Sequence, residues 1–205
     1  GRALGQPAEG LLDGIEVTAG GELLLSSRFR GTQANQPAMN LLLMQQLSMA
    51  PEGSPEAKLR RSVRHLNLVC QIAPLLHGFD GLESLSLNLV EGARWQDLSN
   101  CGKFNSLLSF SLIHHQSKEQ PCTVVSLNGL NAPLLQNLFV SGLGLTSVEA
   151  LSTSTCLIHV DLSNNTELLS ISGLKSSAQT LETLNLEACS LLSSIEPLEG
   201  ATGLQ

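Results

Sequence analysis

A leucine motif that recurs at a nearly constant interval constrains the fold of this chain more than any other feature. The motif has the form L-x-x-L-x-L, and its copies open at Leu135, Leu157, Leu181 and Leu204, at intervals of 22, 24 and 23 residues. A fixed period of this length is typical of a stacked repeat, in which no copy buries its own apolar face and neighbours together form the core. The sequence therefore predicts one array rather than several globular domains.

Weaker copies of the motif precede these. They open at Val63, Leu82 and Leu107, and the intervals from Val63 to Leu135 are 19, 25 and 28 residues. The variation predicts loops of unequal length between otherwise equivalent strands. We expect the array to occupy residues 63–205.

The spacing within each copy predicts its secondary structure. The last two leucines of the motif alternate with polar residues, as in a strand with one buried face. A later pair of apolar residues, three positions apart, suits one turn of α- or 3₁₀ helix on the opposite side. We therefore expect Leu138, Val160 and Leu184 to lie on adjacent parallel strands and to face inward. The later pairs are Leu76–Phe79, Trp95–Leu98, Leu127–Leu130, Val148–Leu151, Ile171–Leu174 and Ile195–Leu198.

The ninth position of a copy falls where the strand must turn. It is occupied by Asn165 in one copy and Cys189 in the next, whereas Val90 and His115 occupy it in earlier copies. Because backbone groups at a turn need hydrogen-bond partners, we expect the Asn165 and Cys189 side chains to supply them.

The copies LIHVDLSNNTELLSISGLKSSAQT and LETLNLEACSLLSSIEPLEGATG resemble leucine-rich repeats. They are similar to the 22–24-residue repeats of bacterial internalins and of kinetoplastid leucine-rich repeat proteins. The resemblance covers residues 63–205 and implies an α/β solenoid, with parallel strands on a concave face and short helical, 3₁₀ or turn segments on the convex face. It also implies that the concave face binds other proteins and that the chain has no catalytic activity of its own.

Residues 1–62 carry only fragments of the pattern and form an N-terminal flank, either a cap or a set of degenerate early repeats. Leu12, Ile15 and Val17 match a repeat opening. Pro37 favours a helix that runs to Leu47, because proline suits the first helical position. The fit of Met44, Leu47 and Met49 to the motif competes with that helix. A cap is favoured over early repeats, and residues 50–58, with two prolines and a glycine, predict a break.

Cysteine content and hydropathy restrict the cellular setting. The five cysteines are odd in number and no C-x-x-C pair occurs, which argues against a disulfide framework and a zinc site. We interpret them as buried thiols in a reducing, intracellular compartment; a cytoplasmic or cytoskeletal location is favoured and an organellar one stays open. No apolar run approaches the ~20 residues of a membrane span. No cofactor is expected.

The acidic residues are unevenly distributed. Residues 1–62 hold six basic and six acidic side chains, whereas residues 63–205 hold five basic and twelve acidic ones, which gives the net charge of −7. Nucleic acid needs a basic footprint, so it is an improbable partner for the array. A basic protein suits this charge better, because opposite charges speed encounter.

The register of the motif predicts which strand side chains face solvent. Phe139 is the most informative of them, because an exposed aromatic among polar residues is typical of an interface anchor; the alternative is that a segment of the same chain covers it. The predicted binding residues occupy the third position (His65, Ser84, Ser109, Asn137, His159, Thr183) and the fifth position (Asn67, Ser86, Ser111, Phe139, Asp161, Asn185) of successive copies.

The sequence disfavours two chemical alternatives, a catalytic triad and a metal site. His159, Asp161 and Ser163 share one strand face, but nothing in the sequence supplies an oxyanion hole or a pocket for a catalytic triad. His114 and His115 with Cys122 lack a metal-ligand spacing, so we expect ordinary surface or turn histidines.

The favoured function is a non-catalytic protein–protein interaction scaffold or adaptor. The alternative is a regulatory or substrate-recognition subunit of an enzyme complex, of the phosphatase or ubiquitin ligase type. The array has no polar cap near Gln205, so we expect either further repeats or another chain at that end. Membership of a larger assembly stays open.

Overall fold

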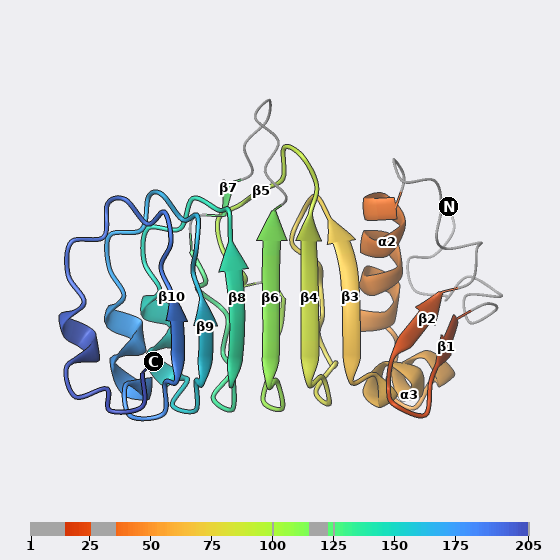
Figure 1. The fold of residues 1–205 in the computed structure, drawn as a ribbon. Coiled ribbons are helices and arrows are strands. Elements are labelled where there is room, and N and C mark those ends of the chain that lie inside the picture. The colour runs from red at the N-terminus through yellow and green to blue at the C-terminus, as the bar shows by residue number, and fades with distance from the viewer. Residues whose placement is uncertain (1–14, 26–35, 100, 115–122, 125, 205) are drawn as a thin grey trace.

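The central element of the computed structural model is a parallel sheet of six strands in the order β10-β9-β8-β6-β4-β3 (Figure 1). The structure describes residues 15–25, 36–99, 101–114, 123, 124 and 126–204. Each strand comes from one copy of the motif, and neighbours in the sheet are successive copies. The strands are β3 (His65–Cys70), β4 (Ser84–Leu89), β6 (Ser109–His114), β8 (Asn137–Ser141), β9 (His159–Asp161) and β10 (Thr183–Asn185).

The strand register confirms the predicted stacking. Leu138 pairs with Val160, and Val160 pairs with Leu184, each across a parallel ladder. Leu138 is fully buried and Val160 is 3% exposed, while Leu184 is half-buried and packs against the same core. Residues on either side of these positions point the other way, as alternation along a strand requires. The parallel leucine-rich sheet is thus built as the motif predicts.

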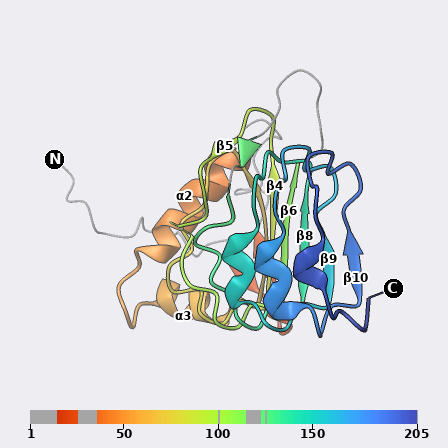
Figure 2. The same ribbon diagram turned by 90° about the vertical axis from the view of Figure 1, so that its left-hand side faces the viewer.

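The return half of each copy forms a second layer beside the sheet (Figure 2). In the last three copies it contains a 3₁₀ helix: η1 (Glu149–Thr153), η2 (Ser172–Ser177) and η3 (Glu196–Leu198). The first member of each apolar pair directly precedes the helix, and its carbonyl accepts a hydrogen bond from the amide of the second member at 2.9 Å. The spacing of three therefore corresponds to one tight helical turn in these copies.

The pair predicted at Trp95 and Leu98 is wrong by three residues. The equivalent turn lies at Leu98–Cys101, where the Cys101 amide donates to the Leu98 carbonyl at 2.9 Å. Trp95 instead belongs to β5 (Arg94–Trp95), which pairs with β7 (Thr123–Val124), and its indole N–H donates to the Gln71 carbonyl at 3.0 Å. The two longest copies use their extra residues for this additional strand pair before the turn.

The N-terminal flank begins with an antiparallel hairpin of β1 (Ile15–Val17) and β2 (Leu23–Leu25). The interpretation of Ile15 and Val17 as an early repeat strand is therefore wrong, because within the described residues β1 pairs with β2 alone, and in the antiparallel direction. Leu12 lies outside the described residues. The hairpin closes through a hydrogen bond from the Thr18 amide to the Glu22 carbonyl, with Gly21 at φ +83°, a conformation that favours glycine.

Two helices follow the hairpin. Helix α2 (Gln36–Ser48) confirms the helix predicted from Pro37, and Met44 and Leu47 are fully buried in it rather than in a repeat strand. Met49 lies beyond the helix and is 70% exposed. Helix α3 (Pro55–Ser62) begins inside the predicted break, because Ser54 caps it by accepting a hydrogen bond from the Ala57 amide at 3.1 Å.

The flank is joined to the outer edge of β3 by specific hydrogen bonds. The Gly21 carbonyl accepts from the Arg64 amide at 2.8 Å and the His65 amide at 3.1 Å, the arrangement that successive strands of the array also use. Asn40 of α2 is buried and donates from Nδ2 to the Val69 carbonyl at 3.1 Å. Helix α2 also packs directly against β3. These contacts extend one hydrophobic core from α2 into the array.

The turns after β9 and β10 are held by the side chain of the ninth residue, as predicted for these two copies. Asn165 donates from Nδ2 to the carbonyls of Val140 and Leu162, each at 2.8 Å, and accepts from the Leu143 amide at 3.2 Å. Cys189 donates from Sγ to the Leu162 carbonyl at 3.1 Å. Both side chains therefore link a copy to the copy before it.

The last described copy leaves more apolar surface exposed than the inner copies. Ile195 is 63% exposed, whereas Ile171, its equivalent one copy earlier, is fully buried. Leu191 is 49% exposed. None of the helices in the described ranges is long and apolar enough to cross a membrane.

Candidate protein-binding face

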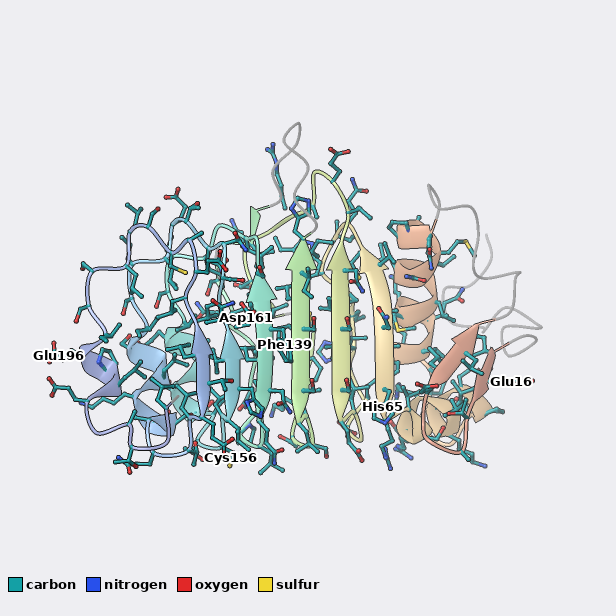
Figure 3. All side chains as sticks on the ribbon, viewed as in Figure 1. Glu16, His65, Phe139, Cys156, Asp161 and Glu196 are labelled. Atoms are coloured by element: carbon teal, nitrogen blue, oxygen red, sulfur yellow. The ribbon has the colours of Figure 1, made fainter. Side chains whose placement is uncertain are left out.

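The third- and fifth-position side chains form two rows across one face of the sheet, which we call the strand face. Figure 3 labels three of these residues, His65, Phe139 and Asp161. The ladders place the predicted residues side by side without a slip in register. All of them are exposed or half-buried. The rows run His65–Ser84–Ser109–Asn137–His159–Thr183 and Asn67–Ser86–Ser111–Phe139–Asp161–Asn185.

Sequence reasoning missed a third row of the strand face. The longer strands continue for two more residues, so the seventh position also faces outward and is half-buried. The signal was present, because the polar–apolar alternation simply extends past the motif. The third row contains Val69, Asn88, Ile113 and Ser141.

Phe139 is the large apolar side chain in the middle of this polar face, and it is 41% exposed. Its direct neighbours are Ser111 on β6 and Asp161 on β9. Ile113, two residues beyond Ser111, lies diagonal to Phe139 and is half-buried. The centre of the strand face thus presents an aromatic ring and an aliphatic neighbour inside a surround of small polar groups.

Hydrogen bonds between strands hold the polar side chains on the β9 side of Phe139. His159 Nδ1 lies 2.9 Å from Thr183 Oγ1 on β10. Asp161 accepts from Asn185 Nδ2 at 3.1 Å and from the Ser163 amide at 2.8 Å. These side chains are therefore arranged before any ligand arrives, which lowers the entropic cost of binding.

The same contacts argue against the catalytic alternative. In a triad the base bonds to the nucleophile and to the residue that orients it. Here His159 bonds to Thr183, Asp161 to Asn185 and to a backbone amide, and Ser163 Oγ lies 3.1 Å from Ser141 Oγ. The three residues share a face without forming the contacts that the chemistry requires.

The prediction of a surface or turn histidine is wrong for His114. His114 ends β6 at the eighth position and is buried, so it is not a surface histidine. The eighth position faces the core because the strand continues its alternation to its last residue. His115 and Cys122 lie outside the described residues, and the described part of the chain holds no group of three or more potential metal ligands.

The described cysteines Cys70, Cys101, Cys156 and Cys189 are free thiols. Burial, with a smaller contribution from the neighbouring Cys101, raises the pKa of Cys70 to about 12. Burial, with a smaller contribution from Asp97, likewise raises the pKa of Cys101 to about 12. A thiol of this kind forms little reactive thiolate near neutral pH, so these two cysteines pack as core residues.

Comparisons with known proteins do not assign this chain to a family. No family model matches the sequence, and the curated proteins give no match. Among solved structures, an internalin from Listeria monocytogenes is similar, with 20% sequence identity and a TM-score of 0.45. The similarity covers 83% of this chain and 43% of the internalin chain.

Proposed function

We propose that this chain, which has a leucine-rich repeat fold, binds a protein partner on its strand face and does not itself catalyse a reaction. The array would curve as a solenoid with the strand face on its concave side and the 3₁₀ helices on its convex side. Residues 1–62 would act as the N-terminal cap that shields β3. The exposed, centrally placed Phe139 is the observation that carries the proposal.

Phe139 is a binding candidate because its exposed aromatic ring lies among small polar side chains. An aromatic ring exposed to water gains by burial, and aromatic residues at the centre of an interface contribute most of the binding energy. Ile113 enlarges the apolar centre, while the serine, asparagine and histidine side chains around it supply hydrogen-bond partners for a rim. Within the described residues, this arrangement suits a protein surface better than a small molecule, because it is broad and polar at its edges.

The partner would be a basic protein in a reducing, intracellular compartment, since residues 63–205 hold twelve acidic against five basic side chains and the described cysteines are free. A scaffold and a subunit of an enzyme complex would both use the strand face in this way. Co-purification of a catalytic chain with the native protein would distinguish the second role from the first.

The proposal is tested by affinity capture from the native cells with the double variant Phe139→Ala/His159→Ala. The variant should lose the partner that the natural chain retains, while circular dichroism shows an unchanged fold. Lys175→Ala, on the exposed surface of η2, is the matched control and should retain the partner. Unchanged capture by the double variant would show that the strand face is not the binding surface.

A further inference from the structure

The outer edge of β10 is open. β10 is the last strand of the six-stranded sheet, and no described strand pairs with its far side (Figure 1). One copy earlier, the Ile158 carbonyl accepts from the Glu182 amide at 2.9 Å. In that copy the Leu162 amide also donates to the Asn185 carbonyl at 2.9 Å. The equivalent groups in the copy of β10 are the Glu182 carbonyl and the Leu186 amide, and within the described residues no strand pairs with them.

Apolar side chains beside this edge are exposed, although their equivalents one copy earlier are buried. Leu184 and Leu186 are half-buried and pack against the hydrophobic core, whereas Val160 is 3% exposed and Leu162 is fully buried. Ile195, on the return half of the same copy, is largely exposed. The open outer edge of β10, together with Leu184, Leu186 and Ile195, forms a surface that we call the β10 end.

A groove of about 500 Å³ extends this surface on the helical side of the copy. Its apolar lining includes Ile195, Leu198 and Leu204, and its polar lining includes Glu196 and Glu199. Carboxylates and exposed apolar side chains are therefore neighbours here. The groove has room for an apolar side chain with a charged group beside it.

The β10 end is acidic. Residues 181–204 hold no basic side chain and four acidic ones, all exposed: Glu182, Glu187, Glu196 and Glu199. The ion pairs of the described residues join arginines to Glu52 and Glu83, so none of these four carboxylates is neutralised by one. A second copy of this chain, docked through the same surface, would bring carboxylates against their own equivalents, which like-charge repulsion disfavours. Charge complementarity instead favours a basic partner.

We propose that the β10 end binds an extended segment of a basic protein, which adds to the sheet as a further strand. An exposed sheet edge is a template for such addition, in which main-chain hydrogen bonds supply affinity and alternate side chains supply specificity. The inward side chains of the segment are apolar and cover Leu184, Leu186 and Ile195. Lysine or arginine side chains beside them lie among the four carboxylates.

Charge selects the partner, whereas main-chain hydrogen bonds and apolar contacts hold it. A single exposed ion pair contributes little to affinity, so the carboxylates alone would not define a site. The β10 end is also separate from the strand-face centre, because Phe139 lies on β8 and β9 separates β8 from β10. The two surfaces can therefore be tested independently.

The test uses the whole chain, labelled with ¹⁵N, and titrates it with a short acetylated and amidated peptide in which valine and lysine alternate. At saturation, hydrogen exchange at the Leu184 and Leu186 amides should slow about tenfold or more, because these groups gain hydrogen-bond partners. The Thr183 amide already donates to the Ile158 carbonyl at 3.1 Å, so its exchange should change less.

Two matched peptides separate the contributions. One carries glutamate in place of lysine, which reverses the charge. The other keeps the lysines but carries N-methyl groups on alternate main-chain nitrogens, which removes hydrogen-bond donors. Each should bind about tenfold or more weakly than the first peptide.

Variants of the chain test the same surface. Ile195→Ala should weaken peptide binding about fivefold, because an apolar contact is lost. Its control is Leu42→Ala, since Leu42 is 49% exposed on α2 at the opposite end of the array. Glu182→Gln/Glu187→Gln removes two charges beside β10 and should also weaken binding about fivefold.

The control for these charges is Glu16→Gln/Glu22→Gln, which removes two charges at the other end and should change nothing. Figure 3 shows Glu16 at the opposite end of the array from Glu196. The proposal is overturned if the glutamate or N-methylated peptide binds equally well, if the Ile195 and Glu182/Glu187 variants bind as the natural chain does, or if no peptide binds saturably.

Sedimentation of the chain alone tests the competing occupant. A dimer that Ile195→Ala abolishes would assign the β10 end to a second copy and overturn the proposal; a monomer agrees with it. Phe139→Ala should bind the valine–lysine peptide as the natural chain does, so failure here is separable from failure of partner capture by the strand face.

Discussion

The side-chain amide of Asn165 donates to the main-chain carbonyl of Val140, in the preceding copy, at 2.8 Å. This bond joins two successive copies of the motif at the point where the strand turns. Asn165 is completely buried and also bonds to the Leu162 carbonyl and the Leu143 amide, with a longer contact to the Ser163 carbonyl at 3.4 Å. The turn would otherwise leave these main-chain groups buried without partners.

Substitution of Asn165 tests this role. Asn165→Ala should lower the free energy of unfolding by about 3 kcal/mol or more, because three buried backbone groups lose their partner. Asn131→Ala removes an exposed amide that makes no side-chain hydrogen bond to the described residues and should change the free energy by less than about 0.5 kcal/mol. Urea unfolding of both variants measures the difference. Equal effects would contradict a structural role for Asn165.

Gly173 tests how closely successive copies approach on the helical side. A Cβ atom at this position would overlap the carbonyl oxygen of Val148 in the preceding copy. Gly173→Ala should therefore force the two copies apart. The thermal midpoint should fall by several degrees, which corresponds to a loss of about 1–3 kcal/mol in the free energy of unfolding. At Gly20 an added Cβ meets only Thr18 Oγ1 at 3.7 Å, so Gly20→Ala is the control. A Gly173→Ala variant as stable as the Gly20→Ala variant would contradict close packing of successive copies at Gly173.

Ile171 and Ile195 occupy equivalent positions in adjacent copies but differ in burial, at 0% and 63% exposed. Ile171→Ala should destabilise the chain by about 2–5 kcal/mol, because it opens a cavity between two copies. Ile195→Ala should cost less than about 1 kcal/mol, because the side chain is largely in contact with water. Chemical denaturation of the two variants provides the comparison. Similar losses of unfolding free energy would contradict the exposure of the Ile195 side chain.

The buried thiols make stability depend on alkaline pH. The pKa of Cys70 and of Cys101 rises from 9.0 to about 12 in the folded chain, so only the unfolded chain releases these protons between those values. Their contribution is fully present below pH 9 and should then fall by about 1.4 kcal/mol per pH unit for each thiol. The chain contains no tyrosine to add a similar term.

Urea unfolding at pH 8 and at pH 10 measures this slope. A Cys70→Ala/Cys101→Ala variant should lose most of it, whereas Cys156→Ala, at a half-buried position, should not. A slope that persists in the double variant would assign the alkaline sensitivity to other groups.

The strand face could be read from sequence because two regular patterns determine it. Alternation along a strand decides which residues face outward, and the repeat period decides which of them become neighbours. His65 and Thr183, at the two ends of one row, were therefore placed by the same rule as Asn137 in its middle. Their role in binding is a further step, which no pattern in the sequence tests.

The sequence-based predictions that were wrong, at Ile15, Val17 and Trp95, share one cause: short apolar patterns do not determine tertiary pairing. Two apolar residues in a short strand do not specify the direction of pairing, so Ile15 and Val17 fit a repeat opening although the turn at Gly21 folds them into a hairpin. A spacing of three also occurs by chance in an apolar sequence, which misplaced the turn at Trp95. The start of β2 meets β3 through a single parallel bridge between Glu22 and His65, and local sequence holds no signal for that contact.

The most direct test of the central claim is site-specific photo-crosslinking in the native cells. A photoreactive phenylalanine analogue replaces Phe139 in one chain and Lys175, on the exposed surface of η2, in another. The account predicts a discrete crosslinked protein from position 139 and none from position 175. Crosslinking from position 175 alone would contradict it, because the partner would then bind the helical side and not the strand face.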